Sequence, residues 1–145
     1  MLAVVDTNVF VSRYLSPTGT CALVFRYLDL GRFHLAVAQS ILDEYERVLR
    51  SPKIASRHNL SEEQIVRATR FVRRRSLYIA DLPDQLKVID VDPKDDKFVE
   101  CAVAGGADMI VSGDRHLLEL GSYEGIRIVS PAVFVTFLEL ESPEG

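Results

Sequence analysis

The chain opens with the stretch that decides its fold, LAVVDTNVFVS at residues 2–12. Its four apolar residues, Leu2–Val5, are typical of a short strand that is buried on both faces of a parallel sheet. Asp6 follows directly, which places one carboxylate at the carboxyl end of that strand. Open parallel sheets bind ligands outside the carboxyl ends of their strands, so Asp6 is a candidate site residue.

Short apolar runs alternate with helical patterns along the rest of the chain. The sequence predicts strands over Leu2–Val5, Leu35–Ala38, Leu86–Ile89, Met109–Val111 and Ile126–Val129. It predicts helices over Thr20–Leu30, Ser40–Arg50, Ser61–Arg75 and Asp95–Ala104, and from Pro131 to Glu139. Ser40 is the expected N-cap of its helix, and Ser61 opens the capping box SEEQ. This alternation indicates an α/β fold, a three-layer α/β/α sandwich around a central, mostly parallel sheet.

Length and composition indicate one globular domain. At 145 residues, 48% of them apolar and 26% charged, the chain has the size and the apolar content to bury a core. We expect a domain over residues 1–140 and a disordered tail over 141–145. Cys21 and Cys101 are expected to be reduced thiols, because no Cys/His zinc spacing surrounds them. The sequence shows neither a signal peptide nor a membrane span, which predicts a cytoplasmic protein.

The net charge of −4 is unevenly distributed. Residues 45–80 hold nine basic and three acidic residues, a balance of +6, whereas residues 81–145 hold five basic and fourteen acidic residues, a balance of −9. The basic lobe is either a solvated helix face or a surface that binds a polyanion such as RNA. Candidate RNA contacts are Arg13, just after the opening motif, and Arg67, Arg70 and Arg74, which recur along one helix face.

Glu44 stands in a setting comparable with that of Asp6. On a helix it lies three residues after Ile41 and four before Val48, at the border of the apolar stripe. Its neighbours Asp43 and Glu46 point elsewhere. A carboxylate turned toward the core is costly unless it is paired, protonated or bound to a metal ion. The alternative is a glutamate whose charged end reaches solvent from the edge of the stripe.

Two further aspartates complete the set of acids. Asp95 shares a helix face with Phe98 and Val99, while Asp96 lies at the rim of that face. Asp114 follows the predicted strand that ends in IVSG. Each of these aspartates is also a good helix N-cap, and the Asp-Thr-Asn sequence at Asp6 is also a good turn.

Taken together, the four carboxylates predict a metal centre. Acids gathered at strand ends and helix faces of one sheet would repel one another, and a divalent cation removes that penalty. Hard oxygen ligands suit Mg²⁺ or Mn²⁺, and such a site can activate water and stabilise a phosphodiester under attack. No Ser-His-Asp arrangement, Walker loop or GxGxxG motif offers a competing chemistry.

Four motifs resemble the PIN-domain nucleases, above all their VapC-like toxin components: VVDTNVFVS, SILDEYERVL, DPKDDKFVECAVAGGAD and MIVSGDRHLL. The resemblance implies an α/β/α sandwich and Mg²⁺- or Mn²⁺-dependent endoribonuclease activity, with Asp6, Glu44, Asp95 and Asp114 as the catalytic, metal-binding acids. Asn8 matches a polar residue that often orients the first aspartate. Ser112 stands where many relatives have threonine. The motif spacing and the helix face both favour Asp95 over Asp96.

The resemblance also implies partners, namely an RNA substrate, a small antitoxin protein that covers the active-site groove, and a second copy of the chain in a homodimer. Two other functions stay open on the residues alone. One is a catalytically silent PIN module that binds RNA or protein. The other is a metal-dependent phosphatase or phospho-receiver, which would also use an aspartate at a strand end.

Overall fold

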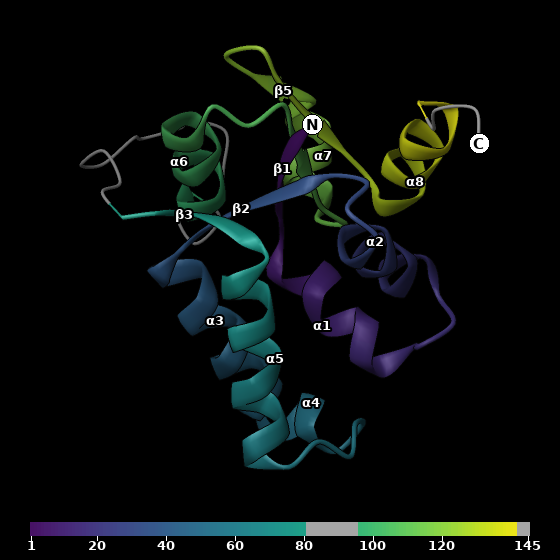
Figure 1. Ribbon diagram of the computed structural model, residues 1–145, viewed down its shortest axis with the longest axis vertical. Coiled ribbons are helices and arrows are strands. Elements are labelled where there is room, and N and C mark those ends of the chain that lie inside the picture. The colour runs from purple at the N-terminus through teal and green to yellow at the C-terminus, as the bar shows by residue number, and fades with distance from the viewer. Residues whose placement is uncertain (81–95, 142–145) are drawn as a thin grey trace.

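A six-stranded sheet forms the centre of the molecule (Figure 1), which the computed structural model describes over residues 1–80 and 96–141, for Asp96 only in its backbone. The strands lie in the order β3-β2-β1-β4-β6-β5. Every neighbouring pair is parallel except β5 and β6, which are antiparallel. The strand bounds are β1 Leu2–Val5, β2 His34–Ala38, β3 Ser76–Ile79, β4 Met109–Val111, β5 Ser122–Tyr123 and β6 Ile126–Val129.

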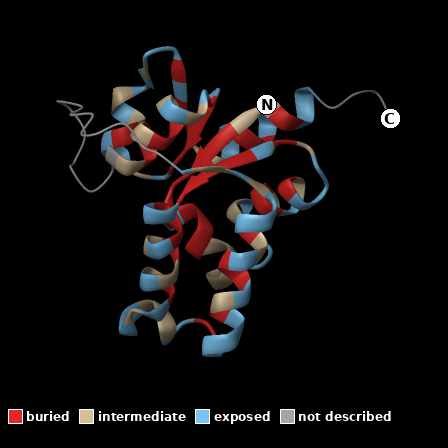
Figure 2. Ribbon diagram, turned by 60° about the vertical axis from the view of Figure 1, so that its left-hand side comes forward, coloured by how far each residue is buried: buried red, intermediate tan, exposed pale blue. Residues whose placement is uncertain are grey.

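Helices flank this sheet and confirm the predicted α/β/α architecture. Their bounds are α1 Thr7–Leu15, α2 Thr20–Asp29, α3 Gln39–Arg50, α4 Pro52–Ala55, α5 Glu62–Arg74, α6 Asp96–Gly105, α7 Arg115–Leu120 and α8 Pro131–Leu140. Helix α6 packs across β1, β2, β3 and β4, whereas α2 packs against α1 and α8. Helices α3, α4 and α5 project away from the sheet as an arm (Figures 1 and 2). Within the described residues, no helix is long and apolar enough to cross a membrane.

Most of the predicted helices and strands are present, but the sequence pattern did not predict several others. Strands β1, β2, β4 and β6 and helices α2, α3, α5, α6 and α8 match predicted segments. The sequence did not indicate β3, because its four residues, SLYI, follow directly on α5 and lack a clear alternation of apolar and polar side chains. The short helices α1, α4 and α7 were also missed. The predicted strand over Leu86–Ile89 and the predicted helix start at Asp95 lie outside the described residues.

The two predicted helix caps have different outcomes. Ser40 is not an N-cap, because β2 runs directly into α3 and Ala38 holds the cap position without a side-chain bond. The capping box at Ser61 is confirmed. The Ser61 hydroxyl accepts from the Gln64 backbone N–H at 3.1 Å, and the Gln64 side chain accepts from the Ser61 backbone N–H at 2.8 Å.

Tyr45 fixes α3 to the carboxyl end of β1. Its side chain is fully buried and stacks on Phe10, with ring centroids 4.2 Å apart and planes 7° from parallel. The Tyr45 hydroxyl donates a hydrogen bond to the backbone carbonyl of Val5. Burial raises the pKa of Tyr45 well above its usual value, so the phenol stays neutral and keeps its donor. The residue after Val5 is Asp6, and the residue before Tyr45 is Glu44, so this contact sets the spacing of two candidate acids.

We expect Tyr45→Phe to lower the free energy of unfolding by about 1–2 kcal/mol, because it leaves the buried Val5 carbonyl without its donor. Urea denaturation measures this loss. The matched control is Tyr78→Phe, which removes a phenol that bonds the exposed side chain of Gln39 at 3.0 Å. Equal stabilities of the two variants would show that the Tyr45 bond does not hold α3 on β1.

Candidate functional site

Asp6 lies where β1 ends and α1 begins. It is only 4% exposed, and its backbone N–H continues the pairing of β1 with β4 by donating to the Val111 carbonyl at 2.9 Å. As N-cap of α1, the Asp6 carboxylate accepts from the backbone N–H of Asn8 at 3.1 Å. Its other oxygen accepts from the Ser112 hydroxyl at 2.5 Å. The helix cap thus buries a carboxylate at the carboxyl edge of the sheet.

Asp114 lies at the same edge, just after β4. The Ser112 hydroxyl that donates to Asp6 also accepts from the Asp114 backbone N–H at 2.9 Å, so one side chain bridges the two acidic positions. The cap interpretation of Asp114 is confirmed, since one of its oxygens accepts from the backbone N–H groups of His116 at 2.8 Å and Leu117 at 3.1 Å. Neither of these bonds uses the second oxygen of Asp114.

Glu44 reaches the site from α3. Its side chain is 14% exposed, and both of its oxygens are occupied by donors of the chain itself. The Thr7 hydroxyl, from the first turn of α1, donates to Oε2. Lys97 of α6 places its ammonium nitrogen 2.5 Å from Oε1, and the exposed Arg47 lies 3.4 Å from the same oxygen.

The neighbouring acids of α3 face other partners, as their angular positions on the helix predict. Asp43 is exposed and accepts from the Gln39 side chain at 2.9 Å. Glu46 accepts from the Thr69 hydroxyl of α5 and pairs with Arg50 at 2.9 Å. Of the three acids in this segment, only Glu44 therefore turns toward Asp6.

The carboxylates influence one another electrostatically. Burial raises the pKa of Asp6, and the negative charges of Asp114 and Glu44 raise it further, against the opposing hydrogen bonds from Ser112 and Asn8. For Glu44, burial also acts to raise the pKa. Its bonds from Lys97 and Thr7, together with the charges of Lys97 and Arg47, outweigh burial and hold that pKa below its usual value. The ionised form of Asp6 is therefore disfavoured by its surroundings, whereas the charge of Glu44 is compensated by Lys97 and Arg47.

These residues suit a divalent cation in their donor chemistry. Hard carboxylate oxygens match Mg²⁺ or Mn²⁺, and a cation beside Asp6 and Asp114 would relieve the repulsion that raises the Asp6 pKa. Over the described part of the chain, no three His, Cys, Asp or Glu side chains form a cluster ready to hold a metal ion. Asp95 lies outside the described residues. Glu44 is bonded to Lys97, which would have to release it before it could bind a cation directly.

Lys97 and Thr7 are the site residues that sequence reasoning missed. A signal for Lys97 was present, because it stands in the first turn of α6, where the helix dipole disfavours a positive charge. A carboxylate close to that position offsets the unfavourable dipole, and Lys97 contacts Glu44 of α3. Thr7 carried no comparable signal, since its hydroxyl is simply the first polar group after Asp6.

The candidate RNA contacts fall into two groups. Arg67, Arg70 and Arg74 are exposed on α5, opposite its buried face, and Arg67 pairs with Glu63 at 2.7 Å. Arg13 instead lies partly buried at a pocket beside α2 and α5. Asn8 contributes its backbone N–H to Asp6, while its side chain is exposed.

Comparisons with known proteins agree with this architecture. A family model described as PIN domain matches residues 3–116. A chain in the crystal structure of VapBC2 from Rickettsia felis bound to a DNA fragment from their promoter has a similar fold, with a TM-score of 0.56. The two chains are 13% identical, and the match covers 90% of this chain and 98% of that one. No curated protein matches the sequence.

We expect Asp6→Asn to stabilise the metal-free protein at pH 7 but not at low pH. Folding raises the Asp6 pKa above its ordinary 3.8, so the contribution of Asp6 to stability is fully present below pH 3.8 and is lost as the pH rises through the folded-state pKa. Asparagine caps helices as well as aspartate does and never ionises. Urea denaturation in EDTA at pH 7 and at pH 3.5 measures the difference.

The exposed Asp43→Asn is the control for this experiment, and it should change stability by less than about 0.5 kcal/mol at either pH. If Asp6→Asn raised the free energy of unfolding equally at both pH values, the ionised Asp6 carboxylate would not be the destabilising group.

Proposed function

Since the chain belongs to the PIN-domain family, we propose that it is a Mg²⁺- or Mn²⁺-dependent endoribonuclease, the toxin of a toxin–antitoxin pair. The observation that carries the proposal is the bridge made by Ser112 between Asp6 and Asp114, with Glu44 within electrostatic reach. A buried aspartate whose charge is opposed by two other carboxylates is costly to maintain unless it serves a ligand. We assign the activity to residues 1–140.

In this proposal Asp6 and Asp114 hold the cation, with Glu44 and Asp95 completing the acidic set. When bound, the cation supplies a nucleophilic water at neutral pH and stabilises charge on the phosphodiester. The chain's own residues supply the geometry. Ser112 holds the Asp6 carboxylate in one orientation, and Thr7 holds Glu44.

Positive charge at the site and along α5 supports RNA as the substrate. Lys97 carries an ammonium group at the site, and the exposed arginines of α5, including Arg67, Arg70 and Arg74, form a basic helix face. Cations that contact phosphates supply most of the sequence-independent affinity for nucleic acid. The overall charge of −4 would by itself oppose RNA binding, so this local distribution matters.

We further propose a small antitoxin as partner, a homodimeric assembly and a cytoplasmic location. The fold likeness to a chain of VapBC2, whose structure was determined with promoter DNA, supports the toxin–antitoxin assignment. The runner-up function is a silent PIN module that binds RNA or protein without cleaving it. Retained RNA binding with no metal-dependent cleavage by the wild-type protein would favour that module. Release of phosphate from a monoester would favour a phosphatase.

The first test compares the three acids of α3. Glu44→Gln should lower the rate of Mn²⁺-dependent cleavage of single-stranded RNA by about 10²–10³-fold, the scale for losing one preorganised electrostatic group. Asp43→Asn and Glu46→Gln are matched controls on the same helix, because their carboxylates bond Gln39 and Thr69 instead. Both should cleave at close to the wild-type rate. Equal losses in all three variants would remove Glu44 from the site.

The second test concerns Lys97, which shares Glu44 Oε1 with Arg47. If a cation approaches this oxygen, the ammonium opposes it, so Lys97→Met should tighten Mn²⁺ binding about tenfold. This is less than the full repulsion of roughly 8 kcal/mol between a doubly and a singly charged group 4 Å apart in a medium of dielectric 20. Titration calorimetry with Mn²⁺ alone measures this without any RNA. The same variant should cleave RNA more slowly, because it lacks a cation at the substrate.

Arg47→Gln is the matched control, since it removes the same charge from the same carboxylate but from a side chain that is 72% exposed. It should leave Mn²⁺ affinity nearly unchanged. If both variants bind Mn²⁺ equally well, Lys97 does not compete with the cation for Glu44.

A further inference from the structure

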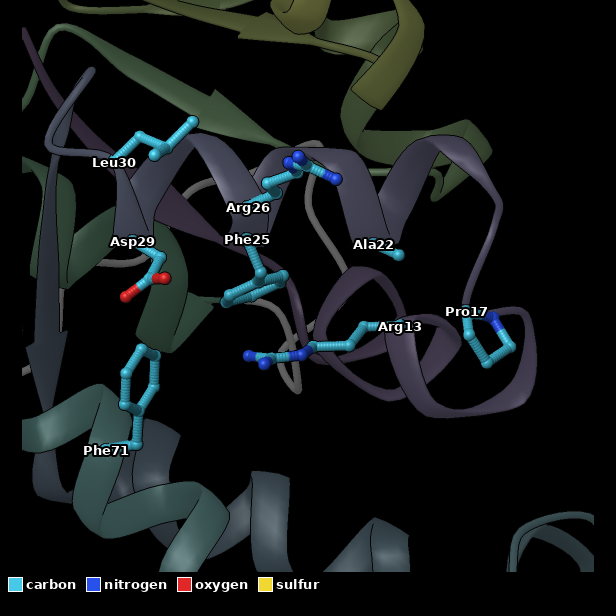
Figure 3. Close-up of a pocket in the computed structure, with 8 residues that line it drawn as sticks. All are labelled: Arg13, Pro17, Ala22, Phe25, Arg26, Asp29, Leu30 and Phe71. Carbon is cyan, nitrogen blue, oxygen red and sulfur yellow. The ribbon is translucent and has the colours of Figure 1, made fainter.

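A pocket of about 580 Å³ opens beside α1, α2 and α5, lined by residues from all three helices (Figure 3). Its volume lies within the range of about 300–1,000 Å³ that is common for ligand sites. Phe25 of α2 and Phe71 of α5 provide apolar walls, and the guanidinium of Arg13 extends beneath Phe25 toward Phe71. Asp6, Glu44 and Asp114 do not line this pocket.

The guanidinium of Arg13 lacks a partner on one side. Its Nη1 atom is buried and makes no hydrogen bond within the described part of the chain. The guanidinium carbon lies 5.0 Å from the ring centroid of Tyr14, 5.2 Å from that of Phe25 and 5.7 Å from that of Phe71. The aromatic rings support the cation but accept no conventional hydrogen bond from Nη1. A buried donor of this kind calls for an acceptor, and a charged donor favours an anion.

The charges around the pocket also favour an anion. Among the residues that the structure describes, Asp29 is the one acid that lines it. Arg75 pairs with Asp29 through an ion pair of 3.2 Å and a hydrogen bond of 3.2 Å to its backbone carbonyl. Arg13 and the exposed Arg26 remain as positive lining residues. Planar guanidinium groups bind the oxygens of phosphate in pairs, which an ammonium group cannot do.

Helix α1 connects the pocket to the acidic site. Asp6 is the N-cap of α1, and Arg13 follows seven residues later in the same helix, about 10 Å along its axis. Seven residues are close to two full turns, so Arg13 lies on the same side of α1 as Asp6. Phe71, one of the two apolar walls, belongs to α5, which carries the exposed arginines.

We propose that this pocket binds a nucleotide phosphate that flanks the cleaved bond, with the base against Phe71. This inference rests on the proposed ribonuclease function and extends it by naming a second substrate contact away from the metal-binding acids. Sequence-tolerant binding of single strands combines basic side chains with aromatic surfaces, and this pocket supplies both. The sequence alone shows no such surface, because its aromatic residues come from separate helices. Arg13 takes the phosphate, and Arg26 at the rim adds attraction.

The test measures RNA binding separately from cleavage. Fluorescence anisotropy with a labelled 2′-O-methyl oligouridine ten-mer in EDTA reports binding without metal and without hydrolysis. Arg13→Gln should weaken binding about tenfold and reduce the slope of log K against log salt by about one, the change for one lost phosphate contact. Arg13→Lys should restore only part of the affinity, because it keeps the charge but loses the planar pair of donors.

The matched control is Arg127→Gln, which removes an exposed charge from β6, a strand outside the pocket. It should change binding by less than twofold. Circular dichroism establishes that each variant is folded, and if Arg13→Gln fails to fold, the exposed Arg26→Gln replaces it with an expected three- to fivefold loss. Uridine monophosphate and inorganic phosphate, added as competitors, distinguish a strand contact from a free nucleotide or phosphate site. The proposal is supported if uridine monophosphate displaces the oligonucleotide, or if neither competitor does. Displacement by inorganic phosphate but not by the monophosphate overturns the role of the base.

Failure of this inference and failure of the ribonuclease proposal give different results. If the wild-type protein cleaves RNA while Arg13→Gln binds it as well as Arg127→Gln does, the subsite is overturned and the nuclease stands. If the wild-type protein does not cleave RNA but Arg13→Gln still loses affinity, the nucleotide site stands without the nuclease. Binding of a glutamate-rich peptide that depends on Arg13, with no Arg13-dependent RNA binding, overturns the nucleotide proposal in favour of a protein partner.

Discussion

In the centre of the sheet, Val5 of β1 pairs in parallel with Val111 of β4, and the next backbone N–H, that of Asp6, continues the pairing. Both strands therefore end at one edge, and the first polar side chains beyond them meet there. A shift of the pairing by one residue would reverse the faces of a strand and separate Asp6 from Ser112. The core residues of β1 are buried on both sides, so such a shift would force both packed faces to rearrange at once. The acidic edge is thus a consequence of the core's packing.

Asp6 and Glu44 lie in electrostatic environments that shift their pKa values in opposite directions. Within the described parts of the chain, Asp6 accepts from neutral donors alone, Ser112 and the backbone of Asn8, so burial and its acidic neighbours dominate its pKa. Glu44 is held by Lys97, and its pKa is lowered. Asp6 would therefore be stabilised by a bound cation, whereas Glu44 already has a cationic partner in Lys97. In the metal-free protein, Lys97 does locally what a metal ion would do for the whole set.

The strand ends could be predicted from the sequence, because a buried strand followed by an acid is a local pattern, and Asp6 and Asp114 both follow from it. The orientation of Glu44 also followed from local helix angles. Contacts between distant segments could not be predicted in this way. Lys97 meets Glu44 across 53 residues of sequence. Strand β3 was missed since its residues are only partly buried and lack clear alternation. The Ser40 cap failed because β2 and α3 join without an intervening loop, so the helix starts at Gln39.

The bond between Ser112 and Asp6 joins residues that are 106 positions apart. On a ribosome, β1 emerges first, and its partner β4, Met109–Val111, is made only after the helices and strands that lie between them in the sequence. Contacts between such distant segments form late, after the cost of closing the loop between them has been met. An N-terminal fragment that ends before Ser112 therefore lacks one wall of the acidic edge, however well its first helices fold. The acidic edge is therefore incomplete in the growing chain until the segment that carries Ser112 has been made.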